Sequence, residues 1–201
     1  GEIRFSVITE ASQHTVALQT GAVDISNGVP DTDISKFGEG GEFSEGNAVG
    51  VVLDNLTYDV EYNMSDSSVF KDDENLRLAL AYAIDKEGVN VGAFNGNGKA
   101  VKDFANATYP DYNPEWDSEG YYDYDVDKAK EYLAQSAYDG RTLRLEYINS
   151  GMSEMIAQLL QAYWGQIGVT VELIGYDQMM VQQEHYNKEG FDILVKTTGS
   201  T

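Results

Sequence analysis

The sequence predicts an α/β protein, because segments with strand periodicity alternate along the chain with segments of helical periodicity. Apolar residues alternate with polar ones in the strand segments and recur every three or four residues in the helical segments. Such alternation is typical of a sheet whose faces are covered by helices. Strands are expected at residues 2–9, 23–25, 49–53, 57–62, 143–147, 169–173 and 191–195, and helices at 12–20, 72–84, 125–133, 152–167 and 178–188.

The first part of the chain is expected to hold several short strands and one helix. In residues 2–9 apolar side chains alternate with polar ones, which predicts a half-buried strand. The helix at 12–20 is expected to end at Gly21, because glycine readily takes the left-handed conformation that closes helices. Three further short apolar segments follow before Asn63, at 23–25, 49–53 and 57–62.

After Asn63 the periodicity becomes helical. Asp72 or Asp73 is a suitable N-cap, because its carboxylate can accept bonds from the first free backbone N–H groups. The apolar residues behind it fall on one helix face: Leu76, Ala79, Leu80, Ala83 and Ile84. Residues 88–124 are rich in Gly, Asn, Tyr and Pro, and we expect them to be irregular.

The last part of the chain carries the clearest signals. Asp125 is expected to cap a helix, and residues 143–147 alternate as a strand. An unbroken apolar stripe over 152–167 predicts a helix that ends at Gly168. A strand at 169–173, a helix closed by Gly190 and a strand at 191–195 complete the pattern.

Composition excludes several functions. The 201 residues carry a formal charge of −21, which opposes binding to nucleic acids. Cysteine is absent, so this segment has no disulfide and no thiolate metal site. The apolar segments are interrupted too often to span a bilayer.

No catalytic or metal site is expected. The glycines before Lys99 lack phosphate-loop spacing, since Ala100 stands where a Ser or Thr is needed. Asp123, Asp125 and Asp127 resemble the start of a calcium loop, but Lys128 replaces the required glycine, so helix capping explains them better. No cofactor is expected either.

Several short segments occur in the order found in one protein family. They include Asn63, Arg77 and the run Leu80-Ala-Tyr-Ala-Ile-Asp85. The other segments are Ala17–Ile25, Tyr124–Leu133, Ile156–Gln161, Gln166–Val171 and Phe191–Ile193. Together they resemble the family 5 extracellular solute-binding proteins, which are the peptide- and nickel-type receptors of ABC importers.

The resemblance implies a two-lobed fold of the periplasmic-binding-protein type II class, of which this chain is an internal fragment. Residues 1–63 would form part of the first lobe, and residues 64–201 most of the second. Asn63 matches the place where the family chain passes between lobes, so it is expected at the hinge. The change of periodicity at the same residue supports this boundary.

The resemblance also implies a function without catalysis. The parent protein would be a monomer that traps a solute, foremost an oligopeptide, by hinge closure and delivers it to a membrane permease. It would lie at the extracellular face of the membrane, held by a lipid anchor, or in the periplasm. Two alternatives remain open: an extracellular hydrolase, and a sensor or interaction module on the same scaffold.

Six residues are candidates for ligand contact. Tyr109 and Tyr112 belong to an aromatic, proline-containing loop suited to gripping an extended chain, although packing over the core is the alternative. Asn97 and Gly98 could bring bare backbone close to a ligand, although an ordinary turn is the alternative. Thr198 and Gly199 belong to the segment Lys196–Thr201, which lacks the aromatic residue and the Asp that peptide-binding members often carry after this strand. This departure puts peptide specificity in question.

Overall fold

The computed structural model describes residues 1–50, 56–101, 112–115, 122–187 and 190–199. The chain forms two compact units, residues 1–52 and residues 53–201. This division falls before the expected boundary at 63, because residues 56–62 pair into the sheet of the second unit. How the units correspond to lobes of a longer protein stays a prediction.

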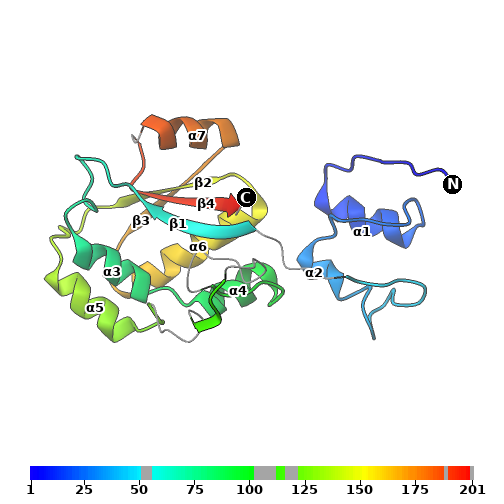
Figure 1. Cartoon of the computed structure of the whole chain (residues 1–201), viewed down its shortest axis with the longest axis horizontal. Helices are drawn as coiled ribbons and strands as arrows, with labels where there is room; N and C mark the ends of the chain where they lie inside the picture. Colours follow the sequence, from blue (N-terminus) through cyan, green and yellow to red (C-terminus); the bar gives the residue numbers. More distant parts are fainter. Residues whose placement is uncertain (51–55, 102–111, 116–121, 188–189, 200–201) are drawn as a thin grey trace. The chain divides into compact units, whose positions relative to one another are not determined.

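The second unit is built on a four-stranded sheet with the order β1-β4-β2-β3 (Figure 1). Strands β2, β3 and β4 are parallel, and β1 is antiparallel to β4. All four overlap the predicted strands, although β3 and β4 each begin two residues later than predicted and also end later. The α/β class is confirmed. Their bounds are Leu56–Tyr62 for β1, Leu143–Ile148 for β2, Val171–Tyr176 for β3 and Ile193–Gly199 for β4.

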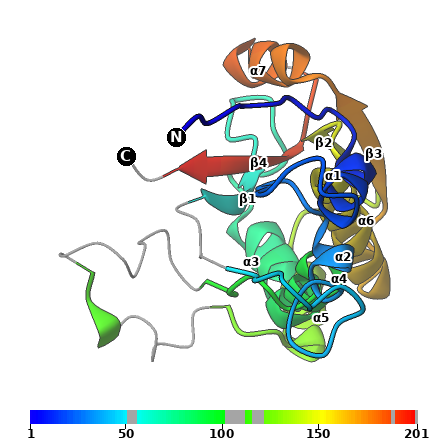
Figure 2. The same cartoon turned by 90° about the vertical axis from the view of Figure 1, so that its right-hand side faces the viewer.

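Helices cover both faces of this sheet, as Figures 1 and 2 show. Helix α6 (Gly151–Gln166) lies on one face together with α4 (Lys86–Phe94), and α7 (Gln178–Asn187) lies on the other. Helices α3 (Glu74–Tyr82) and α5 (Val126–Gln135) pack against each other. No helix in the part of the chain that the structure describes is both long and apolar enough to cross a membrane.

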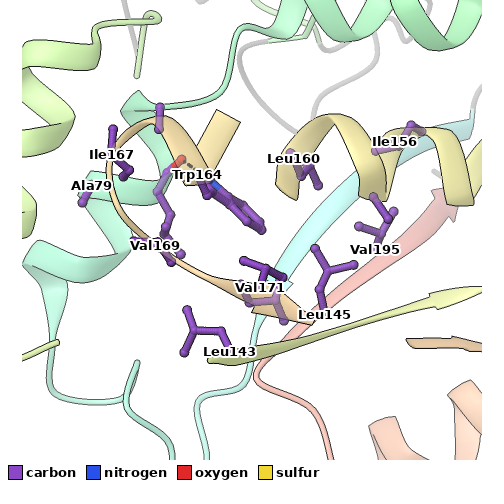
Figure 3. Close-up of a cluster of buried hydrophobic side chains, with 14 of the residues drawn as sticks. Ala79, Leu143, Leu145, Ile156, Leu160, Trp164, Ile167, Val169, Val171 and Val195 are labelled. Carbon is purple, nitrogen blue, oxygen red and sulfur yellow. Dashed lines mark hydrogen bonds between the residues drawn. The ribbon is translucent and has the colours of Figure 1, made fainter. Parts of the chain in front are cut away.

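The core lies between α6 and the sheet (Figure 3). Trp164 is fully buried, and its indole Nε1 donates to the carbonyl oxygen of Leu80 over 3.0 Å, which ties α6 to α3. Leu160 and Ile156 continue the same helix face above the strands. The apolar stripe predicted over 152–167 is therefore confirmed as the face that α6 presents to the sheet.

The predicted N-caps form. Asp73, rather than Asp72, caps α3, with its Oδ1 accepting the backbone N–H of Leu76 over 2.9 Å. Asp125 caps α5 by accepting the N–H of Lys128 over 2.9 Å. Each cap satisfies a backbone donor that the helix itself leaves free.

Helix α4 corrects the expectation that residues 88–124 are irregular from their start. Asp85 caps it through the N–H of Gly88, and Asn95 closes it in the left-handed conformation, with φ of 51°. Glycines at 88 and 92 lower the helix propensity that the sequence shows. The packing explains them, because a Cβ at Gly88 would meet the hydroxyl of Tyr163, and one at Gly92 would meet Leu159, both on α6.

The first unit holds α1 (Ala11–Gln19), as predicted, and α2 (Asp31–Ile34). The strands predicted at 2–9 and 23–25 are wrong: neither segment is a strand, and Phe5 is 95% exposed. A strand requires a hydrogen-bonding neighbour, and within the described residues of this unit none is present. Of the strand expected at 49–53, residues 49 and 50 are not strand and 51–53 lie outside the described residues.

Candidate functional site

The candidate site is the carboxyl edge of the sheet, which we define as the edge where the parallel strands β2, β3 and β4 end and the antiparallel strand β1 begins. Open α/β sheets bind ligands outside the carboxyl ends of their strands. In the described residues, β4 pairs with β2 only over Ile193–Val195, whereas it pairs with β1 as far as Gly199. The end of β4 and the start of β1 therefore extend beyond the sheet as a two-stranded ribbon.

Thr198 and Gly199, both predicted ligand residues, lie in this ribbon and are exposed. Thr198 is aligned with Thr57 and Gly199 with Leu56. The Thr198 hydroxyl donates to the carboxylate of Asp59 on β1. Burial raises the pKa of Asp59, although Thr198 and the nearby ammonium of Lys196 act in the opposite direction.

Asn97 and Gly98 lie in the turn that follows α4. The Phe94 ring at the end of α4 packs edge-on against Tyr58 of β1, with 5.5 Å between ring centroids. This contact attaches the end of α4 to the face of β1 that carries the main core, whereas Thr198, aligned with Thr57, lies on the opposite face. That Asn97 and Gly98 share a site with Thr198 and Gly199 stays a prediction.

The backbone donors of this turn are already occupied. The N–H of Asn97 bonds to the carbonyl of Phe94 over 2.9 Å, and the N–H of Gly98 bonds to Oδ1 of Asn90 over 2.9 Å. These are bonds of a helix-closing turn. The ordinary-turn alternative explains them, and any contact that these residues make with a ligand would have to use the Asn97 side chain or free carbonyl groups.

The aromatic candidates are only partly described. Tyr109 lies outside the described residues, and Tyr112 is partly buried in the short described segment 112–115. Two neighbours from the same region pack on the core elements: Tyr122 meets the ring of Tyr82 at 5.7 Å, and Tyr124 meets that of Tyr163 at 6.1 Å. For these two tyrosines the structure supports packing over the core.

Asn63 lies directly after β1, at the opposite end of that strand from the carboxyl edge. It is buried, and its Nδ2 donates to the carbonyl of Phe191 over 2.9 Å while its Oδ1 accepts the N–H of Ser65 over 2.9 Å. Its own N–H bonds to the carbonyl of Asp192. Asn63 therefore ties the exit of β1 to the entrance of β4, and its hinge role stays a prediction.

A depression of about 510 Å³ lies at the start of α3, lined partly by Asp72, Asp73 and Glu74. Both oxygens of Asp73 are occupied, one by the N–H of Leu76 and one by that of Ala137 over 2.7 Å. Asp73 therefore serves helix capping, and Glu74 lies in the first turn of the same helix. The described ranges contain no cluster of three or more His, Asp or Glu side chains arranged to hold a metal ion.

Two polar side chains make buried or close contacts that the sequence patterns did not predict. In the first unit, His14 Nδ1 and the Ser26 hydroxyl are 2.7 Å apart, and the imidazole Nε2 lies 3.2 Å from the carbonyl of Ile8. In the second unit, Glu146 is fully buried although its alternation with Leu145 and Tyr147 predicts a polar face. The burial of Glu146 could have been predicted from the α/β class, because inner strands of a sheet with helices on both faces are buried on both sides.

Comparison with known proteins gives consistent matches. The family model described as "Bacterial extracellular solute-binding proteins, family 5 Middle" matches residues 1–201. The dipeptide-binding protein of Escherichia coli K12 is 24% identical over 179 residues, covering 86% of this chain and 32% of that protein. Heme-binding protein A of Haemophilus influenzae is 26% identical over 178 residues, covering 86% and 31%.

Solved structures show the same fold. The ABC transporter substrate-binding protein CtaP of Listeria monocytogenes superposes with a TM-score of 0.77 at 24% identity, covering 96% of this chain and 38% of that one. This chain spans about a third of the length of the curated relatives it matches.

Proposed function

Because the chain belongs to family 5 of the bacterial extracellular solute-binding proteins, we propose that it is part of a receptor that captures an oligopeptide for an ABC importer. The family match over residues 1–201 carries this proposal. In this proposal the parent protein acts as a monomer at the extracellular face of the membrane, lipid-anchored, or in the periplasm. It closes around the ligand and hands it to the permease without chemical change.

The carboxyl edge is the part of this chain that we propose faces the ligand. It presents exposed hydroxyl and backbone groups at Thr198 and Gly199, and carboxylates of β1 lie behind them. Backbone groups of an extended peptide can pair with such a strand end, while the charge of Asp59 favours a cationic group. The two relatives described above are named as a dipeptide-binding and a heme-binding protein. Because these ligands differ in class, the ligand of this protein has to be identified by experiment.

The first experiment identifies the ligand. The full-length protein that contains this chain is purified without denaturation and analysed by native mass spectrometry. A peptide adduct that is released on unfolding is the expected result. A metal chelate, heme or sugar in its place would contradict the oligopeptide proposal while leaving solute capture intact.

The second experiment tests the edge. Thr198→Val removes the hydroxyl but keeps the side-chain shape, and we expect about a tenfold loss of affinity for the identified ligand, the equivalent of one lost polar contact. Thr142→Val is the matched control, because Thr142 is exposed and immediately precedes β2 at the opposite end of the sheet. Equal affinities of the two variants in calorimetry would place the ligand elsewhere.

A further inference from the structure

Glu146 is a carboxylate in an apolar position of the sheet. It lies on β2, and its partners in register are Leu194 of β4 and Ile174 of β3. The side chain is fully buried, and neither carboxylate oxygen has a hydrogen-bond partner among the described residues. Within the described ranges, the nearest cationic group is Nη2 of Arg144 at 3.6 Å, which is too long for a hydrogen bond.

Helix α7 covers Glu146 and adds a second carboxylate. The side chains of Glu184 on α7 and Arg144 on β2 both lie beside Gly190. Glu184 repels an ionised Glu146, and Arg144 attracts it. The Arg144 side chain is 41% exposed to solvent, and this exposure weakens its compensation of the buried charge.

Other charged groups under α7 belong to a neighbouring set. Glu61 of β1 forms an ion pair with Lys196 of β4, and its other oxygen lies 3.6 Å from Nδ1 of His185 on α7. Asp59 of β1 lies on the same face and is engaged by Thr198. Lys188 and Glu189, the next charged residues along the chain, lie outside the described residues.

The apolar contact that holds α7 on the sheet is small. Val181 is the buried apolar side chain of the helix, and it packs in a cluster with Phe191 and Leu194, flanked by Ile148 and Tyr176. The large core on the opposite face does not include α7. An unpaired negative charge on Glu146, buried beneath a helix that is held by so few apolar contacts, would therefore strongly weaken the attachment of α7.

We propose that protonation of Glu146 controls how firmly α7 is attached to the sheet, so that this helix is a pH-dependent element of the second unit. With the carboxyl group neutral, α7 closes over an uncharged group. With the carboxylate ionised, water must reach Glu146, and α7 must open locally to admit it.

The direction of the pH dependence follows from the surroundings. Burial is the main cause that raises the pKa of Glu146, and the negative charge of Glu184 adds to it, while Arg144 acts in the opposite direction. The pKa rises from 4.5 to about 7. A carboxyl group whose pKa is raised by folding contributes stability that is fully present below its unfolded pKa and is lost as the pH rises through its folded pKa. Attachment of α7 is therefore expected to weaken between slightly acidic and slightly basic pH.

The test is hydrogen–deuterium exchange of the full-length protein, read by mass spectrometry at about pH 5.5 and about pH 8.5 and corrected for intrinsic exchange. We expect the amides of α7 to exchange about tenfold faster at the higher pH, whereas those of α5 keep their rate. In Glu146→Gln, which is neutral at every pH, α7 should show no such step. Absence of the step in the unmodified protein, or an equal change in α5, would overturn the proposal.

Three further variants separate Glu146 from its neighbours. Glu184→Gln should move the midpoint of the step to lower pH, because it removes the repelling charge, and this holds even if Glu146→Gln fails to fold. His185→Asn should keep the step; its loss there would assign the pH dependence to the imidazole and overturn the role of Glu146. Glu131→Gln, on the exposed side of α5, is the charge-matched control and should leave the profile unchanged.

Discussion

At the scale of the residue, a few buried polar side chains connect segments that lie far apart in the sequence. Trp164 joins α6 to the end of α3, and Asp73 joins the start of α3 to Ala137 after α5. Asn63 joins the end of β1 to the start of β4. Each bond satisfies a group that would otherwise be buried without a partner, and this makes its loss more costly than that of an exposed bond.

For Asn63→Ala we expect the free energy of unfolding to fall by about 1–3 kcal/mol, because the carbonyl of Phe191 and the N–H of Ser65 lose their side-chain partner. Chemical denaturation measures the change. Asn149→Ala, at an exposed position after β2, is the control and should change stability by less than about 0.5 kcal/mol. Equal stability of both variants would show that Asn63 is not a tie within the second unit.

At the scale of the element, α4 shows how packing overrides helix propensity. Its two glycines are unfavourable for an isolated helix, yet they let α4 approach α6 closely. Gly165 of α6 is different, since nothing lies near the position of its missing Cβ and the residue is exposed. The same substitution should therefore have opposite effects at the two sites.

We expect Gly165→Ala to raise the free energy of unfolding by about 0.5–1 kcal/mol, through reduced freedom of the unfolded chain. Gly88→Ala should instead lower it by about 1–3 kcal/mol, because the new methyl group meets the Tyr163 hydroxyl and the Asp85 carboxylate. Thermal denaturation measures both. Adding Tyr163→Phe to Gly88→Ala should recover part of the loss, and a stabilising Gly88→Ala would refute the packing argument.

At the scale of the whole molecule, the second unit is a sheet covered on both faces with its strand ends free at the carboxyl edge. An open strand end gives a ligand only one wall of a site, and a ligand-binding cleft buries most of its ligand. The proposed function therefore requires a second wall, and we propose that hinge closure of the full-length protein supplies it.

Hinge closure predicts that the full-length protein becomes more compact on binding. Small-angle X-ray scattering should show a smaller radius of gyration after addition of the ligand identified by mass spectrometry. A chemically similar compound that calorimetry shows not to bind should cause no change. Saturation with the true ligand without compaction would exclude closure as the mechanism.

The sequence by itself determined much of the local structure of the second unit, although it did not predict α4. Capping at Asp73 and Asp125, the stripe of α6 and the alternation in β1, β2 and β3 depend on neighbours within a few residues, so periodicity predicts them. It also indicated the family. Of the candidate site, it selected Asn97, Gly98, Thr198 and Gly199, and their contact with a ligand stays a prediction.

Only the tertiary structure decided what depends on distant partners. Residues 2–9 have strand periodicity but form no strand, because pairing requires a neighbour that periodicity does not supply. Glu146 reads as a solvent-facing residue until α7 covers it, and Gly88 reads as a helix breaker until α6 lies against it. Burial and strand order arise from contacts between remote segments, and these contacts exist only once the chain has folded.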